Sequence, residues 1–490
     1  MKKRRTADPL KKVESLFNQK KYSAIVELLS PCKDLSSDLH LYLSKSNVML
    51  GNLANGQKHC ELAIEKNPKN ARAWKFLASI RYSLGQLEGV INALAKASEL
   101  DPDNINTKIN FAEFLRLGGL NEKSLEVYKS INLTGREDKE LLVMYYVDYG
   151  VLLKDMGKKN EALEKFKKVL ELDASNPQGY INIAALCLEQ QKIEQAAPYV
   201  LKAYELDPEN EDILRNVAIY YCASGDVVKC VNVTKKAINI KCRKYPNGFV
   251  DPKQSYMDTS IANEALHALH GAIEKLQIQY FLAFGTLLGI VRDGDLLPHD
   301  KDMDIGVPFE LPRPMLFQAL DQFGFTCDQK EKLLNPDTYN ISVTHKESKI
   351  PIDLFFFKRT DSGFVTGLDT KPVPVTWSFP YFKFEYCQWR NKLWLIPHEP
   401  EVFLETTYGP DWKVPDPYFD TVVSGCNRNR ESDAVALAYA FTRMYDRIER
   451  QEWKKALGYC RQILRLGEDQ FVRDLSAWLE QRESESSTQS

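Results

Sequence analysis

Two aspartates two residues apart, Asp302 and Asp304, stand at the start of an expected strand over residues 303–307. Side chains at positions i and i+2 of a strand point to the same face, about 6 to 7 Å apart at the backbone, so two carboxylates there repel each other unless a cation lies between them. Paired Asp oxygens suit Mg²⁺ or Mn²⁺, which keep coordination positions open for phosphate oxygens. Asp300 shares the parity and would extend the cluster. An isolated pair of this kind is also typical of an acidic surface loop.

A third carboxylate, Asp353, interrupts the otherwise apolar strand expected over residues 350–358. An unpaired ionised carboxylate in such a strand is costly, so Asp353 needs a partner. If this strand lies beside Asp302 and Asp304, three carboxylates surround one or two metal ions, as in enzymes that transfer phosphoryl or nucleotidyl groups. Asp353 and Asp300 are also candidates for the general base.

Gly285 and Thr286 follow a short apolar strand expected over residues 279–284 and precede apolar residues at helical spacing. The glycine would let a ligand approach the backbone, and the first amides of the helix, with the Thr286 hydroxyl, would offer hydrogen-bond donors to a phosphate. Gly-Thr before a helix is equally consistent with a simple N-cap.

Several stretches over about residues 260–425 follow one another in a recognisable order: Gly285 to Gly289, Arg292, Pro298 to Gly306, Ile352 to Leu354, and Tyr408 to Trp412 with Pro415. Together, and in this order, they resemble the LicD and fukutin-type family. The resemblance implies a nucleotidyltransferase-like fold and transfer of phosphocholine or ribitol phosphate from a CDP-activated donor to a glycan.

By the same resemblance, Asp302, Asp304 and Asp353 would be the metal carboxylates and Gly285 with Thr286 the phosphate cradle. Arg292 would be a charge partner for the donor phosphate. Where bacterial LicD sequences tend to have Trp, this chain has His299, and Lys301 lies inside the acidic cluster, which is closer to the fukutin pattern. We expect a structural or supporting role for His299.

The N-terminal half repeats with a period of 34 residues. Gly51, Gly85 and Gly119 mark that period, and the windows 37–70, 71–104, 105–138, 143–176, 177–210 and 211–244 align as helix hairpins, with a looser unit at 6–36. The period, the small residues and the Asp-Pro punctuation resemble the tetratricopeptide repeat (TPR) over about residues 6–244. A TPR solenoid leaves a concave groove that commonly binds a peptide or protein partner.

Turn-forming residues at 245–258 predict a linker, followed by an α+β catalytic domain at 259–428. Helical spacing returns over 429–482, which predicts a C-terminal hairpin that either packs on the catalytic domain or caps the solenoid. We expect the tail 483–490 to be disordered. The predicted fold is therefore a TPR-type solenoid, an α+β nucleotidyltransferase-like domain and a C-terminal helical hairpin.

Composition excludes several classes of protein. The chain of 490 residues has a formal net charge of -2, so no global excess of positive charge recruits nucleic acid. The ten cysteines form no C-x-x-C pair, and no apolar run approaches the roughly 18 residues of a membrane span. The N-terminus lacks the apolar segment of a signal peptide. We expect reduced thiols, a cytoplasmic location and no membrane span.

The predicted function is Mg²⁺- or Mn²⁺-dependent transfer of a phospho-alcohol group from a CDP-activated donor to a glycan or glycoconjugate, with the solenoid binding a partner or the acceptor. One alternative is nucleotidylation of a recruited protein, whose product would carry CMP or AMP. The other is a TPR scaffold with an inactive second domain, against which the presence of all three carboxylates argues.

Overall fold

The computed structural model describes residues 9–32, 34–244, 257–328, 332 and 335–487. These residues form two compact units, Met1–Leu206 and Asp207–Ser490, which are described separately below. The linker predicted at 245–258 lies outside the described residues except for Met257 and Asp258. In the described part of the chain, no helix is both long and apolar enough to cross a membrane.

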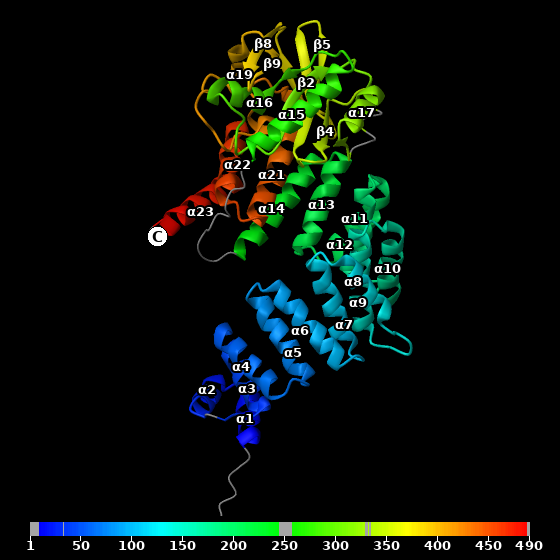
Figure 1. Cartoon of the computed structure of the whole chain (residues 1–490), viewed down its shortest axis with the longest axis vertical. Helices are drawn as coiled ribbons and strands as arrows, with labels where there is room; N and C mark the ends of the chain where they lie inside the picture. Colours follow the sequence, from blue (N-terminus) through cyan, green and yellow to red (C-terminus); the bar gives the residue numbers. More distant parts are fainter. Residues whose placement is uncertain (1–8, 33, 245–256, 329–331, 333–334, 488–490) are drawn as a thin grey trace, which may run out of the picture. The chain divides into compact units, whose positions relative to one another are not determined.

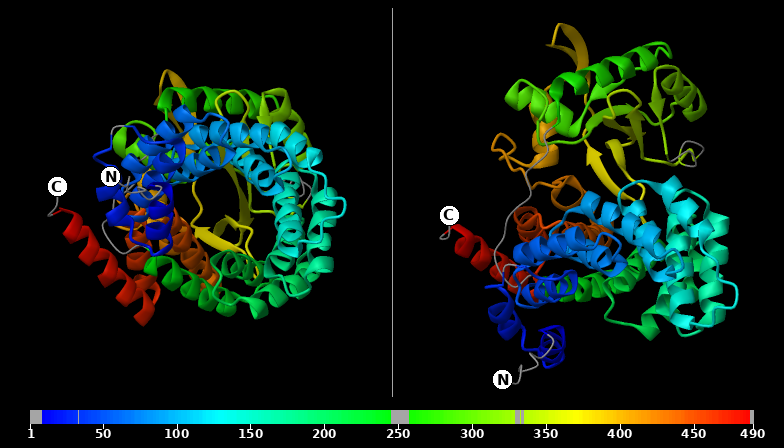
Figure 2. Two further views of the ribbon diagram at one scale, coloured as in Figure 1. Left: turned by 90° about the horizontal axis from the view of Figure 1, so that it is seen from below. Right: turned by 60° about the horizontal axis from the view of Figure 1, so that its bottom comes forward.

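The first unit is all-helical, and Figure 2 shows its helices following a curved path. Successive helices pack as antiparallel hairpins: α1 (Pro9–Asn18), α2 (Tyr22–Leu29), α3 (Ser37–Met49), α4 (Leu53–Lys66), α5 (Ala71–Ser83), α6 (Leu87–Leu100), α7 (Ile105–Leu117), α8 (Asn121–Ser130), α9 (Lys139–Asp155), α10 (Lys159–Leu172), α11 (Pro177–Glu189) and α12 (Ile193–Leu206).

Two local features determine where the helices of each hairpin begin and turn: a capping asparagine and a residue at positive φ. The side chains of Asn70, Asn104 and Asn176 cap the first helix of their repeats by accepting hydrogen bonds from amides three residues on. The turn inside each hairpin needs one residue at positive φ, which glycine adopts without strain. Gly85 has φ +71°, and Gln191 takes the same conformation, with φ +57°, in the repeat that lacks the glycine.

The second unit begins with the helical hairpin α13 (Glu211–Ser224) and α14 (Val227–Arg243). A mixed α/β region follows, with these elements in order (Figure 1): α15 (Thr259–Glu274), β1 (Phe281–Leu282), α16 (Phe284–Leu288), the π-helical turn η1 (Gly289–Asp293), β2 (Met303–Pro308), α17 (Arg313–Gln322), β3 (Phe325–Thr326), β4 (Asn340–His345), β5 (Pro351–Thr360), β6 (Gly363–Leu368), β7 (Val375–Phe379), β8 (Phe384–Trp389), β9 (Lys392–Pro397), α19 (Pro400–Tyr408) and α20 (Thr421–Ser424). The chain ends with η2 (Arg430–Ser432), α21 (Asp433–Glu449), α22 (Trp453–Leu466) and α23 (Gln470–Ser487).

The strands form a seven-stranded mixed sheet in the order β1-β2-β5-β4-β3, continued from β5 by β6 and then β7. β2 and β5 are parallel neighbours, whereas β4 and β5 are antiparallel. Fully buried side chains such as Leu266, Ile305 and Phe356 join α15 to the sheet in one hydrophobic core. β8 and β9 make a separate two-stranded sheet. The predicted fold class, a TPR-type solenoid with an α+β domain and C-terminal helices, is confirmed.

Three details differ from the sequence-based expectation. The first strand is shorter than 279–284, because Phe284 already begins α16, with φ +41°. The tail was expected to be disordered from residue 483, but α23 runs to Ser487, since its buried face, which includes Val472 and Leu479, anchors it against α22. The compact units divide at Leu206, before the hairpin α13–α14 rather than after it, because α14 packs on α21.

Candidate functional site

The predicted carboxylates come together at the β2–β5 pair. Asp304 on β2 lies directly beside Asp353 on β5 in the parallel register. On the other side of β5, Asp353 is paired with Ser342 of β4, whose side chain hydrogen bonds to the carboxyl group. Asp302 precedes β2 by one residue, and its side chain hydrogen bonds with that of Asp300. The placement of Asp353 on a strand beside Asp302 and Asp304 is therefore confirmed.

The pKa values of these carboxyl groups are raised mainly by burial, and neighbouring carboxylates add to the rise. Burial raises the pKa of Asp302 to about 7, with a further contribution from the charge of Asp300. Burial, followed by the charge of Asp302, raises the pKa of Asp353 to about 6. The pKa values of Asp300 and Asp304 are also raised, again mainly by burial. A cation in this cluster would offset the repulsion and favour the ionised forms.

The Gly285-Thr286 turn holds Asp304 in place. The Gly285 amide donates a hydrogen bond of 2.8 Å to Oδ2 of Asp304, and the Asp304 amide donates one of 2.8 Å to Oγ1 of Thr286. A Cβ on Gly285 would lie 2.5 Å from Oδ2 of Asp300 and 3.1 Å from Oδ2 of Asp304. The glycine is thus required for two carboxylates to approach the backbone, and phosphate binding by this turn stays a prediction.

Arg292 lies at the end of η1 and forms a two-pronged ion pair with Asp293, with N–O distances of 2.9 Å from Nε and Nη2. After burial, its positive charge is the second cause that lowers the pKa of His299, and it partly opposes the rise in the pKa of Tyr408. His299 is exposed. The predicted phosphate contact of Arg292 stays a prediction, and in the structure the guanidinium is held by Asp293.

Two side chains that interact electrostatically with the cluster, Tyr408 and Arg443, were not predicted from the sequence. Tyr408, at the end of α19, has its pKa raised by burial and then by the charges of Asp304 and Asp300. Tyr408 belongs to the Tyr-Gly-Pro-Asp-Trp stretch, and this motif could have indicated it. The positive charge of Arg443, on α21, slightly opposes the rise in the pKa of Asp302 that burial and the charge of Asp300 cause. The sequence predicted only a helical hairpin in this region, so it gave no indication of a role for Arg443.

The acidic cluster fits a divalent cation by its chemistry. All four side chains supply oxygen ligands, and burial together with neighbouring carboxylates raises their pKa values, so a bound cation would favour the ionised forms. As the described residues are placed, however, no three His, Cys, Asp or Glu side chains are arranged as a metal-binding group. Metal binding by Asp300, Asp302, Asp304 and Asp353 therefore stays a prediction.

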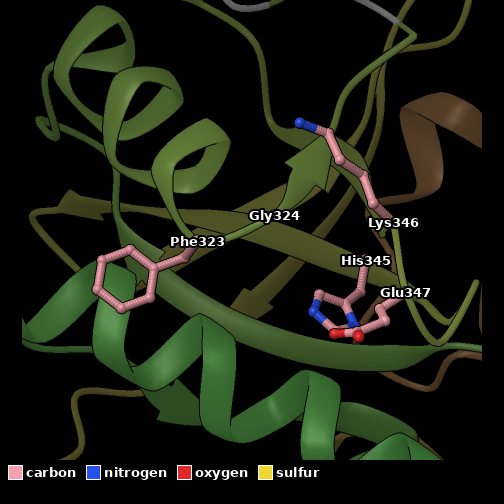
Figure 3. A pocket seen from close by; sticks show the side chains of 5 residues that line it. All are labelled: Phe323, Gly324, His345, Lys346 and Glu347. Carbon is pink, nitrogen blue, oxygen red and sulfur yellow. The ribbon is translucent and has the colours of Figure 1, made fainter.

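A small pocket lies at another part of the sheet, next to β3 and β4 (Figure 3). Phe323, Gly324, His345, Lys346 and Glu347 line it. The His345 ring is already engaged, since its Nδ1 lies 2.8 Å from Oγ of Ser348. The four aspartates do not line this pocket, so it is separate from the acidic cluster.

Comparison with known proteins agrees with this geometry. Residues 277–392, which include the strands and the turn that hold the four aspartates, match the family described as LicD/FKTN/FKRP, nucleotidyltransferase domain. The chain carries a LicD-type domain. Residues 150–211 match the tetratricopeptide repeat family.

Among known relatives, ribitol-5-phosphate transferase FKTN of Homo sapiens is 26% identical over 156 residues, covering 31% of this chain and 33% of that protein. Protein O-mannosyl-transferase TMTC3 of Homo sapiens is 29% identical over 195 residues, covering 39% of this chain and 21% of that protein. The chain thus spans a third or less of the length of these two relatives. A solved structure, the C-terminal part of a TPR repeat-containing protein from Cytophaga hutchinsonii, is 20% identical with a TM-score of 0.38, covering 47% of this chain and 95% of that one.

Proposed function

We propose that this protein is a transferase that moves a phospho-alcohol group, of the ribitol-phosphate or phosphocholine type, from a CDP-activated donor to a hydroxyl group on a glycan. The observation that carries the proposal is the pairing of Asp304 with Asp353 on neighbouring parallel strands of a LicD-type domain. The similarity to a ribitol-5-phosphate transferase supports the choice of group.

In the proposed reaction the acceptor hydroxyl oxygen bonds to the phosphorus that carries the alcohol. The P–O bond to the bridging oxygen breaks, CMP leaves with that electron pair, and the hydroxyl proton passes to a base. Mg²⁺ or Mn²⁺, when bound, supplies charge neutralisation for the diphosphate and the leaving CMP. Asp302, Asp304 and Asp353, with Asp300, are the side chains that would hold it.

The residues of the chain have distinct proposed roles in this reaction. Gly285 and Thr286 position Asp304: the Gly285 amide donates a 2.8 Å hydrogen bond to its carboxylate, and the Thr286 hydroxyl oxygen accepts one of 2.8 Å from its backbone amide. Asp353 and Asp300 are the candidates for the base. Arg292, held by Asp293, is the candidate to contact a donor phosphate from the η1 side.

We propose that the TPR-type helices recruit the acceptor or a protein that carries it. The curved stack of the first unit supports this, since a TPR solenoid presents its inner helices as an extended binding surface. A glycan attached to a protein or peptide would then be presented to the LicD-type domain of the same chain.

The test is a mass-spectrometric screen of the purified full chain against CDP-ribitol, CDP-choline and other nucleotide-activated donors, with Mg²⁺ or Mn²⁺ and glycan acceptors. We expect an acceptor that gains the mass of the phospho-alcohol, together with free CMP. An acceptor or protein that gains the mass of CMP or AMP would instead establish nucleotidylation. No product with any donor, while the Asp304→Asn variant behaves as the wild type, would contradict the proposal.

A further inference from the structure

Two cysteines face each other across the turn of the hairpin α13–α14. Cys222 is the third-last residue of α13, and Cys230 is the fourth residue of α14. Their side chains hydrogen bond to each other, and both thiols are free. Cys222 is half-buried, whereas Cys230 is fully buried. The pair takes no part in the reaction proposed above.

The spacing of such a pair can be measured in the hairpin α3–α4, which has the same turn. Gly51 and Gly225 have φ values of +81° and +83°, and in both turns the glycine amide donates a hydrogen bond to the carbonyl oxygen three residues before it. The two cysteines lie three residues before and five residues after Gly225, just as Val48 and Gly56 lie around Gly51. A Cβ on Gly56 would lie 2.6 Å from Cγ2 of Val48.

This spacing suits a disulfide bond. Because Cγ2 is about 1.5 Å from its own Cβ, the two Cβ positions are at most about 4 Å apart, and a disulfide needs a Cβ–Cβ distance of about 3.5–4.5 Å. The same ends of α13 and α14 also meet through Lys229, whose Nζ lies 5.3 Å from the centre of the Tyr221 ring. The sulfur atoms can therefore bond with little movement of either helix.

The two thiols differ in reactivity. The hydrogen bond with Cys230 lowers the pKa of Cys222 to about 7, which increases the fraction of thiolate at neutral pH. The same hydrogen bond, followed by burial, raises the pKa of Cys230. Cys222 is also the more accessible of the two. Cys222 is therefore the group that reacts first with an oxidant, and Cys230 is the thiol that follows it.

We propose that Cys222 and Cys230 are a redox-sensitive pair, which a small-molecule disulfide such as oxidised glutathione converts reversibly into a disulfide bond between α13 and α14. The Cys222 thiolate attacks one sulfur of the oxidant, the S–S bond of the oxidant breaks, and one glutathione leaves as a thiolate. Cys230 loses its proton and attacks Sγ of Cys222, and the second glutathione leaves. Two cysteine thiols are oxidised, one glutathione disulfide is reduced, and the two protons end on the two glutathione thiols.

The bond would form where the hairpin supports the LicD-type domain. α14 packs on α21, and Nζ of Lys241 on α14 lies 3.1 Å from a carboxylate oxygen of Glu211 on α13 and 3.5 Å from one of Glu449 on α21. At the turn, a Cβ on Gly225 would lie 3.1 Å from Cβ of Pro372, which stands between β6 and β7. A covalent link restricts the unfolded chain, so oxidation should stabilise this unit.

The test is oxidation of the purified full chain with oxidised glutathione, followed by alkylation of the remaining thiols in denaturant and peptide mass spectrometry. We expect a cross-linked pair of peptides that contains Cys222 and Cys230 and that dithiothreitol separates. The Tm of the unit that contains the pair should be about 2–6 °C higher in the oxidised chain than in the reduced chain.

Three variants assign the roles of the cysteines. Cys222→Ala and Cys230→Ala should each abolish the cross-link. In Cys230→Ala, glutathione should stay attached to Cys222, because no second thiol displaces it. Cys187→Ala, at a half-buried cysteine of α11 whose partner helix α12 contains no cysteine, is the matched control and should form the cross-link as the wild type does.

Four results would overturn the inference. A lasting glutathione adduct on Cys222 of the wild type would mean that Cys230 cannot reach it. A cross-link between other cysteines, in place of this pair, would assign the redox chemistry elsewhere. An unreacted pair at high concentrations of oxidised glutathione would mean that the thiols are inert. A lower Tm of the oxidised chain would mean that the bond strains the hairpin.

Discussion

Replacing Asp353 with asparagine should stabilise the metal-free protein at neutral pH. Asparagine nearly conserves the volume of the side chain, retains the hydrogen bond with Ser342, and removes the charge beside Asp304. The pKa of Asp353 is raised from its ordinary 3.8 to about 6, which corresponds to about 3 kcal/mol against the ionised form. Because the side chain is half-buried, solvent screening reduces this to about 1–2 kcal/mol of unfolding free energy.

The pH dependence of this gain has a definite sign. The pKa of Asp353 in the folded protein lies above its unfolded value, so ionisation costs stability as the pH rises from about 4 through about 6. Asp353→Asn should therefore match the wild type in Tm near pH 4 and exceed it at pH 7.5. For a unit of this size, 1–2 kcal/mol corresponds to a Tm difference of about 2–8 °C.

Adding Mn²⁺ at pH 7.5 should reverse the order of the two proteins. The ionised cluster of the wild type binds the cation and gains Tm by mass action, whereas the variant has lost one of its carboxylates and gains much less. Thermal melts at both pH values, with and without Mn²⁺, measure all of these quantities. Asp361→Asn, in the exposed turn after β5, is the matched control and should leave every Tm unchanged.

If Asp353→Asn is less stable than the wild type at pH 7.5, the ionised Asp353 carboxylate does not destabilise the metal-free protein. A Tm difference of the same size at pH 4 and pH 7.5 would refute the same claim. Equal stabilisation of both proteins by Mn²⁺ would place Asp353 outside the metal site.

Three further changes test the site and its supports. Asp304→Asn should abolish turnover in the donor screen with no loss of Tm, because it removes a metal ligand and a crowded charge while conserving volume. Gly285→Ala should reduce turnover by at least about tenfold, because its Cβ would displace the Asp300 carboxylate, whose Oδ2 lies 2.5 Å from the Cβ position. Gln462→Leu should lower the unfolding free energy by about 1–3 kcal/mol in a denaturant titration, because it removes three hydrogen bonds of a buried side chain and leaves their partly buried partners unpaired.

Each of these changes has a control and a contradicting result. Gly467→Ala should be neutral, since a Cβ there meets nothing within 4 Å, and normal turnover of Gly285→Ala would show that the close approach is not needed. Gln470→Leu, at the exposed start of α23, should change the unfolding free energy little. An equally small effect of Gln462→Leu would mean that the hairpin is held by other contacts. Full turnover of Asp304→Asn would remove Asp304 from the site.

Much of the local architecture of this protein follows directly from its sequence. The 34-residue period predicted the helix hairpins, because each repeat carries its own caps and its own left-handed turn residue, which act over a few neighbouring residues. The two-residue spacing of Asp302 and Asp304, and the lone charge of Asp353 in an apolar strand, predicted a cluster of carboxylates, since the cost of isolated buried charge is independent of the fold.

The contacts between distant segments could not be predicted in this way, because they form only in the folded chain. The register that sets Asp304 beside Asp353 depends on strand pairing across the intervening α17, β3 and β4, which no local signal fixes. The Gly285 amide binds the Asp304 carboxylate and not a ligand. This contact also depends on tertiary packing, because it requires β2 to pass close to α16. The packing of α14 on α21 joins segments almost two hundred residues apart. Such contacts depend on the complementarity of whole surfaces, which the sequence specifies only through the folded chain.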